Sequence, residues 1–161
     1  MSRFALVVPF PELAPAVDEL RERTCLSKPS HGMPPHVTLL VPSPPDARTL
    51  GEELRAFEPF DVTFARVDRF PGTAWLAPEP AEPFVAMVGA LVARFPSFRP
   101  YDGRFADVVP HLTVAQAEFD VAVPELEASL PLHARVERAL LLEQVSDERW
   151  AEAASLPLGG V

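Results

Sequence analysis

The order of hydrophobic and polar patterns along the chain occurs twice. Residues 4–8 form a short apolar run that ends in Pro-Phe-Pro, and residues 75–77 form another that ends in Pro-Glu-Pro. Short apolar runs bounded by proline are typical of buried strands. The two runs are therefore predicted to be strands that begin equivalent halves of the chain.

A helix pattern follows each of these strands, because apolar residues recur at spacings of three and four. In the first half these residues are Leu13, Val17 and Leu20, and in the second half they are Phe84, Met87, Val88, Leu91 and Val92. An irregular stretch rich in Ser, Pro, Gly and Asp comes next in both halves. Each half is therefore predicted to continue as an amphipathic helix and a loop.

Each loop ends in Pro-His-x-Thr followed by apolar residues, at positions 35–39 and 110–114. A second helix pattern follows each motif, from Asp46 to Phe57 and from Val121 to Leu130. The halves then end in long β-rich runs, at 59–70 and 131–145. This repeat predicts an α+β fold of two similar lobes related by a pseudo-twofold axis. Each lobe is expected to be a mainly antiparallel sheet covered by helices, with the active-site groove between the lobes and residues 1–161 forming a single bilobal domain.

The two motifs place their polar residues on one side of a strand. Residues i and i+2 of a strand point to the same face, so His36 and Thr38 project together, as do His111 and Thr113. The apolar residues between and after them point the other way, toward a helix-covered core. The pseudo-twofold axis is then expected to bring both pairs to one place in the groove.

Two imidazoles and two hydroxyls at one place suit phosphodiester chemistry. Imidazole titrates near neutral pH, so one ring can take a proton from water while the other gives one to the departing sugar oxygen. Threonine hydroxyls can donate hydrogen bonds to the phosphate oxygens, where negative charge builds up. This scheme requires no metal, and the residues alone leave open which histidine is the acid.

Charge and composition restrict the partners. The net charge of −9 disfavours non-specific binding of long nucleic acid, which needs a basic surface, but it leaves a single phosphate group as a ligand. The one cysteine, Cys25, excludes an intrachain disulfide. The sequence has no signal-peptide pattern and no apolar stretch near the ~18 residues of a membrane span. A cytoplasmic monomer without a membrane partner is the expectation.

The segments Pro-His-Val-Thr-Leu-Leu and Pro-His-Leu-Thr-Val-Ala resemble the motifs of the 2H phosphoesterase superfamily, especially its 2′-5′ RNA ligase-like and RNA 2′,3′-cyclic phosphodiesterase branch. The resemblance extends over nearly the whole chain. It implies a cofactor-free and metal-independent enzyme that opens the 2′,3′-cyclic phosphate of a small nucleotide or an RNA terminus, with reversible 2′-5′ ligase activity in some members. It also implies that His36 is the acid, His111 the base, and Thr38 and Thr113 the phosphate-binding residues.

Gln116 departs from the pattern, because the best-known RNA cyclic phosphodiesterases often carry Arg shortly after the second motif. A smaller cyclic nucleotide or another phosphoester is therefore an alternative substrate. A nucleotide- or phosphate-binding module with little turnover is the alternative function.

Three further residues are candidate substrate contacts. Tyr101 and Arg104 lie in a loop that mixes aromatic and basic residues, typical either of base stacking and phosphate steering or of an ordinary turn. Phe10 ends the first strand and could flank the groove. His31 is expected in a mobile loop that lines the groove; a metal site formed with His36 and an acid finds no support in a Cys or HExxH pattern. His133 is expected to be structural or solvent-facing.

Overall fold

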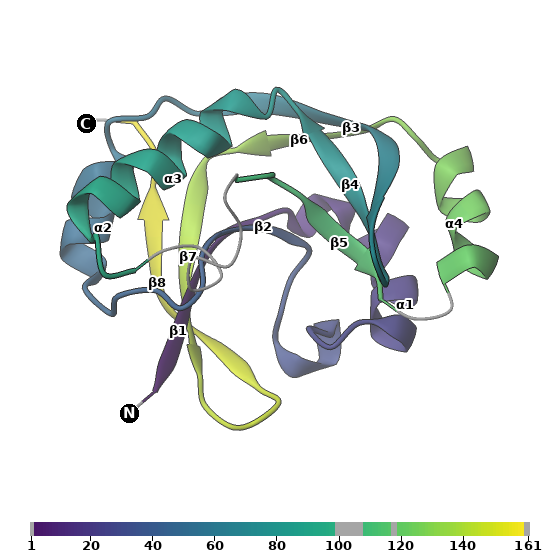
Figure 1. Cartoon of the computed structure of the whole chain (residues 1–161), viewed down its shortest axis with the longest axis horizontal. Coiled ribbons are helices and arrows are strands. Elements are labelled where there is room, and N and C mark those ends of the chain that lie inside the picture. The colour runs from purple at the N-terminus through teal and green to yellow at the C-terminus, as the bar shows by residue number, and fades with distance from the viewer. Residues whose placement is uncertain (1, 99–107, 117–118, 160–161) are drawn as a thin grey trace.

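The computed structural model describes residues 2–98, 108–116 and 119–159. Its strands form two four-stranded antiparallel sheets, with the orders β2-β1-β7-β8 and β5-β4-β3-β6 (Figure 1). The first sheet consists of β1 (Arg3–Pro9), β2 (His36–Leu40), β7 (Arg138–Gln144) and β8 (Trp150–Pro157). The second consists of β3 (Phe60–Phe70), β4 (Thr73–Glu79), β5 (Leu112–Ala115) and β6 (Leu132–Val136). The predicted fold of two similar α+β lobes is confirmed.

Each half of the chain contributes a strand to the sheet of the other half. Strand β3 belongs to the end of the first half but pairs with β4 of the second half, and β7 belongs to the end of the second half but pairs with β1 of the first half. The run 131–145, predicted as one β-rich stretch, is two strands that meet at Glu137. They are separate because β6 pairs with β3 in the second sheet, whereas β7 continues into the first sheet. The exchange ties the two lobes together.

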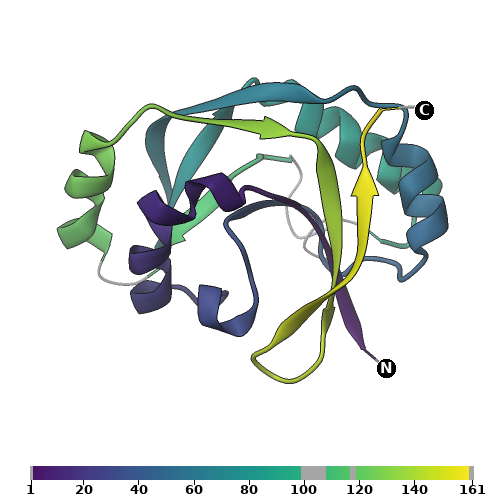
Figure 2. The ribbon, with the colours of Figure 1, turned by 180° about the vertical axis from the view of Figure 1, so that it is seen from behind.

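The helices lie in two pairs at opposite ends of the molecule, and each pair takes one helix from each half (Figures 1 and 2). One pair is α1 (Ala14–Thr24) with α4 (Phe119–Ala128), and the other is α2 (Ala47–Leu54) with α3 (Glu82–Arg94). Short 3-10 helices, η1 (Pro11–Leu13) and η2 (Pro29–His31), flank α1. Helix α2 begins where predicted, because the Asp46 carboxylate accepts a hydrogen bond from the Thr49 amide and caps its N-terminus. No helix in the described ranges is long and apolar enough to cross a bilayer.

One hydrophobic core connects both sheets and the helices. The apolar helix residues named from the sequence spacing belong to it or pack against it. Strand β1 is buried on both faces: Leu6 and Val8 enter this core, while Ala5 and Val7 join a smaller cluster with Met33 on the opposite face. Through Ala5 and Val7, this opposite face of β1 also lines the pocket described next.

Candidate active site

The two Pro-His-x-Thr motifs lie on the edge strands β2 and β5, which contact each other across the two sheets. On β2, Val37 and Leu39 are buried in the core, whereas His36 and Thr38 are only partly buried. On the β5 side, Leu112 and Val114 are fully buried, and the polar residues of the motif lie between and before them. The alternation predicted from strand geometry is confirmed on both strands.

His36, Thr38, His111 and Thr113 line a single pocket of about 270 Å³. Opposite Thr38 in the sheet lies Val7, and opposite Thr113 lies Trp75, and in both pairings the strand register shifts directly beside this position. Within the described residues, neither threonine hydroxyl has a hydrogen-bond partner from the protein. Both are therefore available as donors to a ligand in the pocket.

The two imidazoles are held by the same backbone contact. His36 Nδ1 lies 2.8 Å from the Pro34 carbonyl oxygen, and His111 Nδ1 lies 2.7 Å from the Val109 carbonyl oxygen. A carbonyl oxygen only accepts, so Nδ1 is the protonated nitrogen in both rings. In the neutral ring the lone pair is then on Nε2, and the protonated ring donates from the same atom. Each histidine can therefore act as base or acid through Nε2 without turning.

Burial lowers the pKa of both histidines. Burial brings the pKa of His36 down to about 4, and the positive charges of Arg21 and His111 add to this effect, against the hydrogen bond to Pro34. Burial also lowers the pKa of His111, against the hydrogen bond to Val109. Both imidazoles are therefore favoured in their neutral form in the unliganded pocket.

Aromatic side chains explain the burial of His111. Its ring packs edge-on against Phe70, with centroids 5.2 Å apart, and against Trp75, with centroids 5.7 Å apart. Phe70 also lies against Trp75 and lines the pocket. Because these rings displace water from one side of His111, they disfavour its charged form.

The low pKa of His36 makes the stability of the fold depend on pH. Between about pH 6.5 and 4 the unfolded chain takes up a proton at His36 that the folded protein does not, so stability falls as the pH is lowered through this window. The loss is at most roughly 3 kcal/mol, at ~1.4 kcal/mol per pKa unit. Urea unfolding of the wild type and of His36→Gln at pH 7 and pH 4 measures it. The variant is expected to lose less stability on acidification, and equal losses would contradict the assignment.

Of the three candidate substrate contacts, the structure describes only Phe10, and Phe10 does not line this pocket. Phe10 is wrong as a groove residue, because its ring is fully buried and packs edge-on against Phe64 in the main core. Its backbone N–H nevertheless donates to the Pro35 carbonyl, directly before the first motif histidine. Tyr101 and Arg104 lie outside the described residues.

The two remaining histidines lie elsewhere. His31 does not line the pocket as expected: it belongs to η2, and its Nε2 is 3.7 Å from a carboxylate oxygen of Glu148 in the β7–β8 turn. His133 is exposed on β6, where its Nδ1 is 3.2 Å from the Thr63 hydroxyl, which agrees with the expectation.

The pocket residues that were not predicted as part of the site include Arg21, Phe70 and Trp150. Nothing in the sequence singles them out, since Arg21 lies in a charged helix segment and the two aromatic residues are far from both motifs. Gln116, noted as a departure, also lines the pocket. Its Oε1 accepts a hydrogen bond of 2.6 Å from the Leu26 amide, which attaches the segment after α1 to β5.

Comparisons with known proteins agree with this architecture. The chain superposes on E. coli LigT, solved with 3′-AMP, with a TM-score of 0.63 at 14% identity, covering 99% of both chains. It superposes on the protein TT0787 of Thermus thermophilus with a TM-score of 0.62 at 21% identity, covering 98% of both chains. Among curated proteins, none matches the sequence. The family model of the 2′-5′ RNA ligase superfamily matches residues 9–148, and the chain therefore belongs to this superfamily of 2H phosphoesterases.

Proposed function

We propose that this protein is a metal-independent phosphoesterase that opens a 2′,3′-cyclic phosphate of a nucleotide or an RNA terminus to a 2′-phosphate. The observation that carries the proposal is the pocket itself, where two edge strands present two imidazoles and two hydroxyls to one space. The matching Nδ1 contacts, which orient both Nε2 atoms for proton transfer, support it further.

The reaction needs one proton acceptor and one donor. The base takes a proton from water, the water oxygen bonds to phosphorus, and the bond from phosphorus to the 3′ oxygen breaks. The acid then gives its proton to that oxygen, so both histidines end with exchanged protonation states. If a 5′-hydroxyl replaces water, the same steps form a 2′-5′ linkage, which gives the reversible ligase activity proposed for this site.

Size and charge favour a single nucleotide unit as the part that enters the pocket. A volume of about 270 Å³ lies just below the usual range of small-molecule sites, roughly 300–1,000 Å³. In the described part of the chain, the only permanently charged pocket residue is Arg21, and its charge is already paired with Asp18. A pocket with so little positive charge suits a ligand that carries the single negative charge of one phosphodiester group. The LigT structures with 3′-AMP and with NADP⁺ show that a protein of this fold binds nucleotides.

Two assignments of the acid and the base fit the pair. The family resemblance implies His36 as the acid, whereas the low pKa of His36 favours it as the neutral base. A substrate with an activated leaving group, such as a p-nitrophenyl phosphodiester, needs no acid. The loss of activity in the alanine variant of the acid should therefore shrink by at least ~10-fold on this substrate, while the loss in the variant of the base should not. Equal behaviour of both variants would contradict a division into acid and base.

Each threonine hydroxyl is expected to stabilise the phosphate in the transition state. Thr38→Val and Thr113→Val keep the side-chain shape but remove the donor, and each should lower kcat/KM by roughly 10- to 100-fold, the value of a hydrogen bond to a charged group. Thr38→Ser and Thr113→Ser retain the hydroxyl and serve as matched controls. Valine variants as active as the serine variants would show that the hydroxyls do not contact the reacting phosphate.

A turnover assay with nucleoside 2′,3′-cyclic phosphates and RNA ending in a cyclic phosphate tests the proposal. Purified protein in excess EDTA should open at least one of them, and ³¹P NMR should identify a 2′-phosphate as the product. Calorimetric binding of the same nucleotides without turnover would instead support the binding-module alternative. Neither binding nor turnover would reject both functions.

A further inference from the structure

Arg21 is a buried cation beside the pocket. Its side chain is 1% exposed, and its guanidinium lies between α1 and the segment that leads into β2. Nη1 donates to the Asp18 carboxylate at 2.6 Å. Nη2 donates to the carbonyl oxygens of Ser27 at 3.0 Å and Met33 at 2.8 Å. A buried guanidinium is stable at such a place only when its N–H groups find acceptors, and here both Nη1 and Nη2 do.

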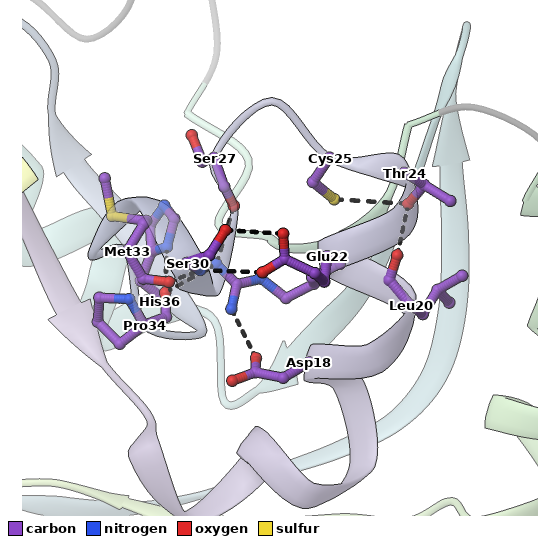
Figure 3. Close-up of polar contacts among 11 residues, drawn as sticks. Asp18, Leu20, Glu22, Thr24, Cys25, Ser27, Ser30, Met33, Pro34 and His36 are labelled. Atoms are coloured by element: carbon purple, nitrogen blue, oxygen red, sulfur yellow. Dashed lines mark hydrogen bonds and ion pairs between the residues drawn. The ribbon is translucent and has the colours of Figure 1, made fainter. Parts of the chain in front are cut away.

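One of its contacts leads directly to the first motif. Nη2 also lies 3.2 Å from the carbonyl oxygen of Pro34, the same oxygen that accepts the hydrogen bond from His36 Nδ1. Figure 3 shows Met33, Pro34 and His36 side by side at this point. The position and orientation of the Pro34 carbonyl decide where the His36 ring points. Arg21 is therefore one hydrogen-bonded group away from the imidazole.

The surroundings of His36 give the charge of Arg21 an electrostatic effect as well. The titratable groups facing this region are Arg21 from α1, Cys25 after it and His111 from the second motif, with Asp18 bound to the Arg21 guanidinium. The Arg21 charge is among the causes that hold the pKa of His36 low. Removing that charge should raise the pKa of His36.

We propose that Arg21 is a positioning residue for His36: by clamping the carbonyls of Ser27, Met33 and Pro34, it fixes the Nδ1–H tautomer and aims Nε2 into the pocket. The inference rests on the proposed function only in treating His36 as a reacting group. The guanidinium contacts Asp18 through Nη1 and the three carbonyls through Nη2, and a lysine ammonium, with a single nitrogen, cannot occupy both positions. A ring displaced by about 1 Å can lose ~100-fold in rate.

If Arg21 had only a structural role, its substitution would lower the stability of the protein without changing the tautomer or the titration of His36. Two readouts separate the cases: ¹⁵N NMR of the His36 imidazole, which reports its tautomer and titration midpoint, and the split of the kinetic effect between kcat and KM. Leu50→Ala is the matched control, since Leu50 is fully buried on α2 and does not line the pocket. It should lower Tm while leaving the His36 signals unchanged.

Arg21→Met is expected to lower kcat by ~10- to 100-fold with less than ~3-fold change in KM. In the same variant His36 should populate both tautomers, and its titration midpoint should rise. Arg21→Lys keeps the charge but not the clamp, so the tautomer should still change, the midpoint should rise less, and the loss in kcat should be smaller. If Arg21→Met does not fold, the His36 tautomer, its titration midpoint and kcat of Arg21→Lys test the proposal instead.

Wild-type tautomer and titration of His36 in the folded Arg21 variants would overturn the proposal. The NMR measurement needs no substrate. Absence of turnover in the wild type would therefore reject the proposed function and leave this test intact.

Discussion

Replacing either motif histidine with alanine should lower kcat for a 2′,3′-cyclic nucleotide by at least ~100-fold, the low end of the range for losing a general acid or base. Both imidazoles line the same pocket, and each is oriented by its Nδ1 contact, so neither can substitute for the other. The His36→Ala/His111→Ala double variant should be far less impaired than the product of the single effects, because the two rings act in one proton-transfer sequence. Steady-state kinetics of the three variants measures this.

His133→Ala is the matched control for these variants. His133 is exposed on β6 and does not line the pocket, so its removal should leave kcat and KM within ~2-fold of the wild type. Activity that survives in both motif variants, or a loss in His133→Ala equal to theirs, would contradict the assignment of the reacting pair.

Among the glycines that the structure describes, Gly32 is expected to give the most destabilising substitution by alanine, at about 2–5 kcal/mol. Gly32 follows η2 with φ of 88°, a left-handed conformation that costs a residue with a Cβ roughly 1–2 kcal/mol. An added Cβ would also meet the backbone oxygen of Trp150, so η2 and the start of β8 would have to separate, at roughly 1–3 kcal/mol. Urea unfolding measures the change, and turnover should fall with it because Trp150 lines the pocket.

Gly72→Ala separates the two contributions. Gly72 also has a positive φ, of 77°, but an added Cβ there meets no atom within 4 Å. This variant should lose only the conformational part, roughly 1–2 kcal/mol. Equal losses in the two variants would show that the close approach of η2 to β8 contributes nothing.

The sequence predicts the placement of the two motif histidines well because it follows from strand geometry. The alternation of polar and apolar residues around His36 needs no knowledge of the partner strand, only the two-residue period. Internal repetition then indicates that both motifs occupy equivalent positions. These two arguments suffice to bring His36 and His111 together, and the structure places them in one pocket.

Local patterns cannot predict features that depend on strands of one half pairing in the sheet of the other half. The division of 131–145 at Glu137 follows from pairing with two different sheets, which no local pattern encodes. Phe10 ends a strand like a groove residue, but its ring turns to Phe64, a residue of β3. Arg21 resembles any exposed helix residue in sequence, and only the return of the chain after α1 surrounds it with carbonyl oxygens.

If the two tripeptides form one phosphoryl-binding site, a crystal structure of the protein with a bound nucleoside 2′-phosphate tests this most directly. We expect phosphate oxygens within hydrogen-bond distance of the Thr38 and Thr113 hydroxyls, with Nε2 of His36 and Nε2 of His111 on opposite sides of phosphorus. A phosphate held by only one of the two motifs, or bound outside this pocket, would contradict the proposed site.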